Sequence, residues 1–206
     1  VFMARVGLTL PLLTERASEM ADEIGFENVT VLALARSFGV KDASLYSHIK
    51  NLRDLRQRVA MSALSALADR AAAALAGRAG KDALVAFADA YRDYAREHPG
   101  RYAATQFELD SDAAEASDAR RHSQLSRAVL RAYDLAEPDE TDAVRLLGSM
   151  FHGYIALEAA GGFGHTPRSS EDSWNKCLDI LHHALDQWPS NQSAVESTIG
   201  KERDSL

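Results

Sequence analysis

The chain has 206 residues, of which 46% are apolar and 26% charged, and its net charge is −7. These values are typical of a globular protein with one large domain, or with a small domain docked on a larger one. They exclude a membrane-spanning helix, because no segment approaches the roughly 20 consecutive apolar residues that it needs. The N-terminal residues also lack the apolar stretch of a secretory signal. Because Cys177 is the single cysteine, no internal disulfide framework is possible, and we expect a cytoplasmic protein.

The spacing of apolar residues predicts an all-α fold of about nine helices with no strand. Thr9 and Thr30 can cap the first and second helices through their hydroxyl groups. Gly25 and Gly39 are expected to end these helices. The four N-terminal helices are predicted at residues 9–24, 31–38, 42–48 and 52–75.

The rest of the chain is also helical by its apolar periodicity. Pro138 stands at an expected first helical position, where a proline is tolerated. Beyond Pro189 the sequence is polar and aperiodic, so we expect a frayed or disordered tail. The five later helices are predicted at residues 84–95, 101–107, 113–133, 138–160 and 174–188.

Basic residues are concentrated in one window of the N-terminal region. Residues 36–58 contain six basic and two acidic residues, a local net charge of +4. Residues 61–206 contain 15 basic and 23 acidic residues. A basic window on an otherwise acidic chain favours contact with nucleic acid phosphates, although a solvated helix face gives the same pattern.

Residues 30–49 have the pattern of a helix-turn-helix, in which two short helices are joined by a tight turn. The second helix of such a unit can lie in the DNA major groove, which is about 12 Å wide. A helical hairpin that only packs within the protein is the alternative. The residues spaced to fix the angle between the helices are Leu32, Ala35, Val40, Leu45 and Ile49.

The segment VTVLALARSFGVKDASLYSHIKNLRDL (29–55) closely resembles the DNA-binding head of the tetracycline-repressor (TetR) family. The resemblance covers about residues 8–60 and rests on the Leu45-Tyr46 pair, His48, Ile49 and the turn that follows. It implies that Thr30 and Tyr46 contact phosphates. The DNA-binding candidates are Thr30, Lys41, Asp42, Ala43, Ser44, Tyr46, Ser47, His48, Lys50 and Asn51.

Two positions depart from the family pattern or leave a role open. Leu52 stands where relatives often have a lysine that helps to hold the DNA backbone. Asp42 begins the second helix of the unit, where it can act as an N-cap or accept a hydrogen bond from cytosine N4.

The C-terminal region carries a second resemblance. The segments HPGRYAAT (98–105) and HGYIALEAAGGFG (152–164) are similar to the regulatory domain of a TetR subgroup named for a Trp-His-Gly signature, the WHG domain. Phe151 replaces the tryptophan of that signature. The similarity covers roughly residues 80–187 and implies a small-molecule effector without identifying it.

These observations predict a three-helix helix-turn-helix head followed by a six-helix bundle. The domains are expected to be a DNA-binding domain (1–55), a ligand-binding and dimerisation domain (56–188) and a flexible tail (189–206). The resemblance implies a homodimer that presents two recognition helices about 34–36 Å apart to double-stranded operator DNA.

The helix at 146–160 is apolar almost all round, so we expect it to be covered on two sides. With the last helix and their two-fold mates it would form a four-helix interface; the alternative is a central core helix in a monomer. The interface candidates are Leu147, Met150, Phe151, Tyr154, Ile155, Trp174, Leu178, Leu181 and Leu185.

Aromatic residues of the central helices suit a cavity for a mid-sized, largely apolar ligand. Each of them could instead be ordinary core. His152 can hydrogen-bond a ligand or a backbone carbonyl. The pocket candidates are Phe87, Tyr91, Tyr94, Tyr102, Phe107, Phe151, His152 and Tyr154.

An enzyme is the competing class. The seven histidines show no metal-ligand spacing, and no nucleophile elbow or phosphate-binding loop occurs. We therefore expect no catalysis, no cofactor and no metal. The predicted function is a repressor that a ligand releases from a palindromic operator; a helical interaction module that has lost operator binding is the alternative.

Overall fold

The computed structural model describes residues 7–189, and within this range every regular element is helical, as predicted. The expected flexible tail lies, beyond Pro189, outside the described residues. Among residues 7–189, no helix combines the length and apolar composition needed to cross a membrane. The elements are α1 (Leu10–Ile24), η1 (Phe26–Asn28), α2 (Val31–Ser37), η2 (Asp42–Ser47), α3 (Leu52–Leu75), α4 (Gly80–Glu97), α5 (Pro99–Ala104), α6 (Ser111–Ala116), α7 (Ala119–Leu130), η3 (Arg131–Tyr133), α8 (Asp139–Ala159) and α9 (Ser170–Asp186).

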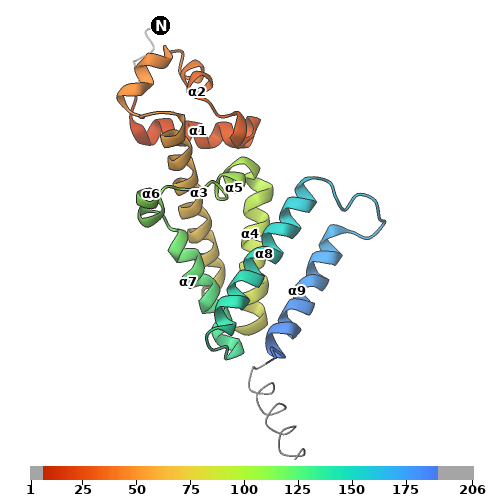
Figure 1. The fold of residues 1–206 in the computed structure, drawn as a ribbon. Helices are drawn as coiled ribbons and strands as arrows, with labels where there is room; N and C mark the ends of the chain where they lie inside the picture. The colour runs from red at the N-terminus through yellow and green to blue at the C-terminus, as the bar shows by residue number, and fades with distance from the viewer. Residues whose placement is uncertain (1–6, 190–206) are drawn as a thin grey trace, which may run out of the picture.

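A small head and a larger body lie at opposite ends of the long helix α3 (Figure 1). The head contains α1, α2 and η2, and α3 leads from it into the body. There α3 packs along α4, and α7 packs on both of these helices. Helices α8 and α9 run antiparallel to each other at the side of the body away from α3 (Figure 1). The short helix α5 lies beneath the head, where it contacts α1, α3 and α4.

The buried residues form two hydrophobic clusters that divide within α3. The head cluster includes Leu13, Leu34 and Leu45 and reaches Ala63 in α3. The body cluster begins at Leu67 in the same helix and centres on aromatic side chains from α4, α8 and α9. Helix α3 therefore contributes residues to both cores and connects them.

The predicted caps of the first two helices are confirmed. The Thr9 hydroxyl accepts a hydrogen bond from the Leu12 N–H, and the Thr30 hydroxyl accepts one from the Ala33 N–H. Each cap satisfies an amide that has no partner within its own helix. Gly39, in the turn after α2, has a φ of +64°, which a residue with a side chain adopts only under strain.

The short helix predicted at 42–48 is present as the 3-10 helix η2. Two local predictions were wrong in detail. The predicted helix 113–133 is broken at Ser117, whose hydroxyl donates to the Ala114 carbonyl and accepts from the Ala119 N–H. Leu32 was expected to fix the angle between α2 and η2, but its side chain is 49% exposed; Leu34 and Ala35 fill that role because they face the head core.

Candidate functional site

Element η2 has a buried side and an exposed side. Leu45 is fully buried in the head cluster and Ile49, just after η2, is almost so. On the other side Ser44 and Ser47 are exposed, and 54% of Tyr46 is accessible to solvent. Burial of Leu45 thus fixes η2 to the head while its polar side chains point outward. Of the ten predicted DNA-binding residues, all are exposed except Thr30 and His48, which are half-buried.

The polar groups around η2 are ordered by local hydrogen bonds. Asp42 accepts a hydrogen bond from the Ala43 N–H at 2.9 Å, so this carboxylate is held at the start of η2. At the next turn, Asn51 caps α3 by accepting from the Asp54 N–H, and Asp54 accepts from the Lys50 N–H. These two hydrogen bonds order the turn, and the exposed Lys50 side chain extends from it.

Part of the basic window serves the structure of the head. Arg56 donates to the carbonyls of Glu27 and Val29, and Arg58 forms an ion pair with Asp54 at 3.0 Å. Arg53 donates to the Glu108 carbonyl. The basic residues of the window that are exposed and make no such contact within the described part of the chain are Arg36, Lys41 and Lys50. The cationic surface is therefore smaller than the charge count indicates.

Of the eight predicted pocket residues, Tyr91 and Tyr102 line one cavity of the described part of the chain. The aromatic rings of one helix face different neighbours, which periodicity does not resolve. The other six are not in the lining of that cavity: Phe87, Tyr94, Phe107, Phe151, His152 and Tyr154.

Each of these six has an identifiable packing role. Phe107 contacts Phe26 in the head, with ring centroids 5.6 Å apart. Tyr154 lies between α8 and α9 and donates to the Ser170 carbonyl. The exposed His152 stacks on Tyr102 from outside. The rings of Phe87 and Phe151 pack in the core behind Tyr91, and Tyr94 is buried against His98.

The cavity that contains Tyr91 and Tyr102 has a volume of about 210 Å³ and lies between α3, α4, α5 and α7. It is lined by Leu64, Leu67, Tyr91, Tyr102, Ala119 and His122. Thr105 and Gln106, just after α5, complete its wall. No side chain in this lining carries a permanent charge. Burial lowers the pKa of His122, which favours the neutral imidazole, and burial raises the pKa of Tyr91.

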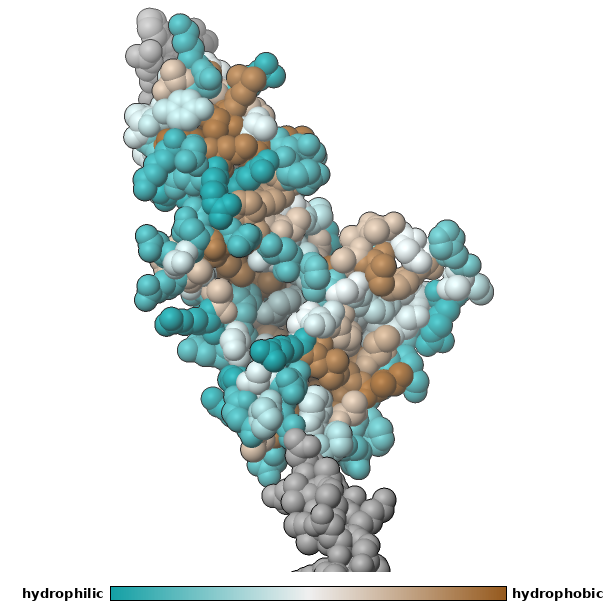
Figure 2. All heavy atoms as spheres, in the orientation of Figure 1, coloured by the Kyte–Doolittle hydropathy of each residue, from teal (hydrophilic) through white to brown (hydrophobic). Residues whose placement is uncertain are grey.

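Most of the predicted dimer-interface residues face the protomer's own core, so the choice of helix face is corrected. Seven of the nine are 5% exposed or less: Leu147, Phe151, Ile155, Trp174, Leu178, Leu181 and Leu185. The outward face of α8 and α9 instead presents Leu146, Leu157 and Ile180, large apolar residues that are exposed. Figure 2 shows brown, hydrophobic surface over this part of the body.

A groove of about 540 Å³ lies between α8 and α9 on the surface of the body. Met150, Tyr154, Leu157, Phe163 and Cys177 supply most of its apolar wall. Met150 and Tyr154 are thus the two predicted interface residues that reach this surface. The groove adjoins the exposed apolar residues of the same helices.

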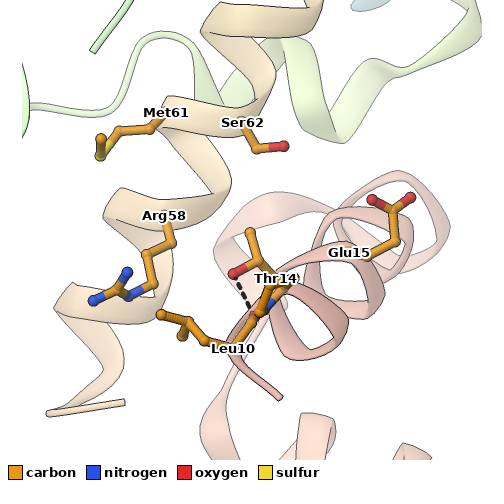
Figure 3. A pocket seen from close by; sticks show the side chains of 7 residues that line it. Leu10, Thr14, Glu15, Arg58, Met61 and Ser62 are labelled. Atoms are coloured by element: carbon orange, nitrogen blue, oxygen red, sulfur yellow. Dashed lines mark hydrogen bonds between the residues drawn. The ribbon is translucent and has the colours of Figure 1, made fainter. Parts of the chain in front are cut away.

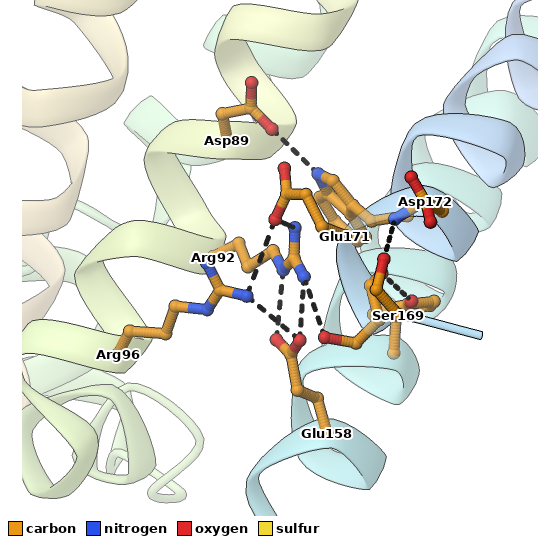
Figure 4. A network of polar contacts seen from close by, with 10 residues as sticks. Asp89, Arg92, Arg96, Glu158, Ser169, Glu171 and Asp172 are labelled. Carbon is orange, nitrogen blue, oxygen red and sulfur yellow. Dashed lines mark hydrogen bonds and ion pairs between the residues drawn. The ribbon is translucent and has the colours of Figure 1, made fainter. Parts of the chain in front are cut away.

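A buried guanidinium holds α4 to α8 and α9 (Figure 4). Arg92 is 2% exposed and forms two hydrogen bonds with Glu158 and one, at 2.8 Å, with Glu171. Its guanidinium also lies over the Trp174 ring, whose N–H donates to Asp89. Hydrogen bonding by Arg92 lowers the pKa of Glu158 to about 2, so this carboxylate stays ionised at neutral pH.

A third hollow, of about 390 Å³, opens between α1 and α3 (Figure 3). Two of its polar groups are already used, because the Thr14 hydroxyl donates to the Leu10 carbonyl and Arg58 is paired with Asp54. Glu15 and Arg58 lie on separate helices at its two sides (Figure 3). The remaining polar side chains of the lining, Glu15 and Ser62, are exposed to solvent.

Three residues that matter in the structure were missed by sequence reasoning. His122 shows no motif spacing, and only its contact with Tyr91 marks it. Arg92 and Asp22 act through partners more than 60 positions away in the sequence, so no local pattern reveals them. Within the described residues, no three His, Cys, Asp or Glu side chains gather as a metal site requires.

Comparison with known proteins gives consistent results for head and body. Residues 84–181 match the family described as Tetracyclin repressor-like, C-terminal domain. The chain is 36% identical over 151 residues to the uncharacterized HTH-type transcriptional regulator Rv0681 of Mycobacterium tuberculosis, covering 72% of this chain and 69% of that protein. It is 31% identical over 159 residues to the uncharacterized HTH-type transcriptional regulator YobS of Bacillus subtilis, covering 77% and 83%.

The fold is also similar to that of a protein solved in complex with DNA. A crystal structure of BioQ with its double-stranded DNA operator superposes with a TM-score of 0.63 at 24% identity, covering 87% of this chain and 99% of that one. Together with the outward-facing η2 and the all-helical body, the two sequence relatives establish that this chain belongs to the TetR family of helix-turn-helix transcriptional regulators.

Proposed function

We propose that the protein is a ligand-responsive repressor that binds a palindromic operator as a homodimer. The observation that carries this proposal is the exposed side of η2, anchored by Leu45 beneath it. Names of relatives point to regulators rather than enzymes.

The exposed groups of η2 suit contact with DNA. Ser44, Tyr46 and Ser47 can bond to base edges or phosphates, and Lys41 directly precedes the element while Lys50 lies in the turn after it. Such phosphate contacts give register and affinity, whereas small side chains let the backbone approach the bases. The TetR-like BioQ fold, solved with its operator, provides a precedent for this use of the head.

The outward apolar surface of α8 and α9 supports a homodimer. Leu157 and Ile180 are more than half exposed, and a groove lies beside them. Large exposed apolar patches are rare on monomers because water contact is unfavourable. Pairing these helices with their two-fold mates would cover the patch and place two heads for two half-sites. The WHG-type assignment of the body remains part of this proposal.

The body cavity supports a response to a small molecule. Its α5 wall contacts the head directly, so a ligand that shifts α5 would change the angle of the head. If the ligand binds one head position more tightly than the other by only a few kcal/mol, it can shift the protein to the position that does not fit DNA.

The test is selection of bound fragments from random DNA by the purified protein. We expect an enriched inverted repeat with half-sites about one helical turn apart. The matched control is Tyr46→Asp, which places a negative charge on the exposed face and should abolish enrichment without unfolding the head. If the parent protein enriches nothing, the alternative of an interaction module without operator binding is favoured. A single unrepeated half-site would contradict the dimer.

A further inference from the structure

The cavity between α3, α4, α5 and α7 contains a hydrogen-bonded chain whose proton positions are fixed by chemistry. His122 Nε2 lies 2.9 Å from the Leu64 carbonyl oxygen, which can only accept, so Nε2 carries the proton. In the neutral imidazole the other nitrogen, Nδ1, is then an acceptor. Tyr91 lies 2.5 Å from Nδ1 and must donate its hydroxyl proton to it. The Tyr91 oxygen is therefore left with lone pairs and no proton for a ligand.

Tyr102 offers the complementary group. This residue is only 7% exposed and lines the same cavity. Burial alone raises the pKa of its hydroxyl to about 12, with no hydrogen bond or charge contributing. Its hydroxyl makes no hydrogen bond within the described residues, and it is not one of the fully enclosed polar atoms that lack a partner. Tyr102 thus presents a donor at the cavity wall that no protein group uses.

The charges near the cavity are balanced or turned away. Asp118 and Arg121 act on His122 with opposite signs. Arg121 is itself paired with Asp69 at 2.6 Å, outside the lining. An ionised ligand would therefore lose its hydration without gaining a counter-charge, which is strongly unfavourable.

We propose that this cavity binds a small, uncharged ligand with a hydroxyl group that accepts a hydrogen bond from Tyr102 and donates one to Tyr91. The inference rests on the effector role proposed above and specifies the ligand's chemical class. The ligand is about the size of one ring: a dry engineered cavity of about 150 Å³ holds benzene, and this cavity is about 210 Å³. Leu64 and Leu67 supply the apolar wall for such a ring.

The test compares three probes of one size on the full chain by ligand-observed NMR: benzyl alcohol, toluene and benzoate. Benzyl alcohol should bind with a dissociation constant of about 1 mM or below. Toluene, which lacks the hydroxyl, should bind about tenfold more weakly than benzyl alcohol. Benzoate should not displace benzyl alcohol from the cavity. This comparison uses the parent protein, so its outcome does not depend on whether a variant folds.

The variant Tyr102→Phe keeps the ring and removes the donor. It should weaken benzyl alcohol binding about tenfold and leave toluene binding unchanged. The matched control is Tyr133→Phe, because the Tyr133 hydroxyl bonds to His182 outside this cavity. Three results would each overturn the proposal. Benzoate could bind as tightly as benzyl alcohol, or the Tyr102→Phe variant could bind benzyl alcohol as tightly as the parent does. The third is that benzyl alcohol does not bind at about 10 mM.

Failure of the two proposals can be told apart because ligand binding is measured without DNA. If the protein selects no operator but Tyr102-dependent binding persists, the repressor function fails and the ligand class stands. If an operator is selected and the probes do not bind as described, only the ligand class is overturned.

Discussion

Asp22, near the end of α1, accepts a hydrogen bond from the backbone N–H of Arg101 in α5 at 2.8 Å. The Arg101 guanidinium forms an ion pair with the same carboxylate at 3.1 Å, and His98 lies 3.2 Å from it. Tyr102, the next residue of α5, lines the body cavity. Arg101 and Tyr102, neighbours in this short helix, therefore contact the head and the cavity, respectively.

Replacing Asp22 by alanine should loosen this connection. The change leaves the Arg101 backbone N–H without its acceptor and the guanidinium without its ion-pair partner, so we expect the free energy of unfolding to fall by about 1–3 kcal/mol in urea denaturation. The control is Glu15→Ala, whose carboxylate is exposed and 3.9 Å from Arg101. It should change stability by less than about 0.5 kcal/mol. Equal losses for both variants would contradict a specific role for Asp22.

Gly100 is the closest backbone contact between α5 and the head. A Cβ atom at this position would lie 1.8 Å from the Ala21 carbonyl oxygen, so a side chain requires the two helices to separate. Gly100→Ala should therefore lower the free energy of unfolding by about 3 kcal/mol and reduce Tm measurably. Ala103→Ser adds one atom on the exposed side of α5 and should cost less than about 0.5 kcal/mol. A Gly100→Ala protein as stable as the parent would show that the contact gives way at little cost.

The sequence predicted the local features of the head but not the packing of the body. The caps at Thr9 and Thr30 and the buried Leu45 are set by neighbouring residues, so a one-dimensional pattern contains them. Helix α8 is apolar on both faces, and nothing in its periodicity distinguishes Leu147, which is buried, from Leu146, which is exposed. That distinction depends on where α4 and α9 lie.

The outward face of α8 and α9 can be tested through the oligomeric state. Ile180 is 58% exposed, so Ile180→Asp should leave the fold intact while placing a charge in the proposed interface. Light scattering at micromolar concentration should then report a monomer where the parent is a dimer. Ile24→Asp, at the exposed end of α1, is the matched control and should remain dimeric. A dimeric Ile180→Asp protein would place the interface elsewhere.

The Arg92–Glu158 pair should make stability depend on pH. Because Arg92 lowers the pKa of Glu158 from its usual 4.5 to about 2, the unfolded chain binds this proton first as the pH falls. The contribution of the pair is therefore complete above about pH 4.5 and is lost as the pH falls towards about 2. Glu158→Gln should be less stable than the parent at neutral pH, with the difference shrinking across this window. A stability difference that stays constant with pH would contradict this role of Glu158. The control is Glu115→Gln, exposed on α6, which should show no such pH-dependent difference.

The exposed side of η2 should separate affinity from sequence preference. Under the proposed function Tyr46 contacts a phosphate, so Tyr46→Ala should weaken binding to all operator variants by a similar factor, about tenfold.

Ser44→Ala should instead alter the order of preference among operators with single base changes. Lys50→Ala should reduce the dependence of log affinity on log salt by about one, since one phosphate contact is lost. Ile24→Ala, on the exposed end of α1, is the control and should leave the affinity, the base preference and the salt dependence unchanged. If Tyr46→Ala kept full affinity at physiological salt, η2 would not lie in the groove as proposed.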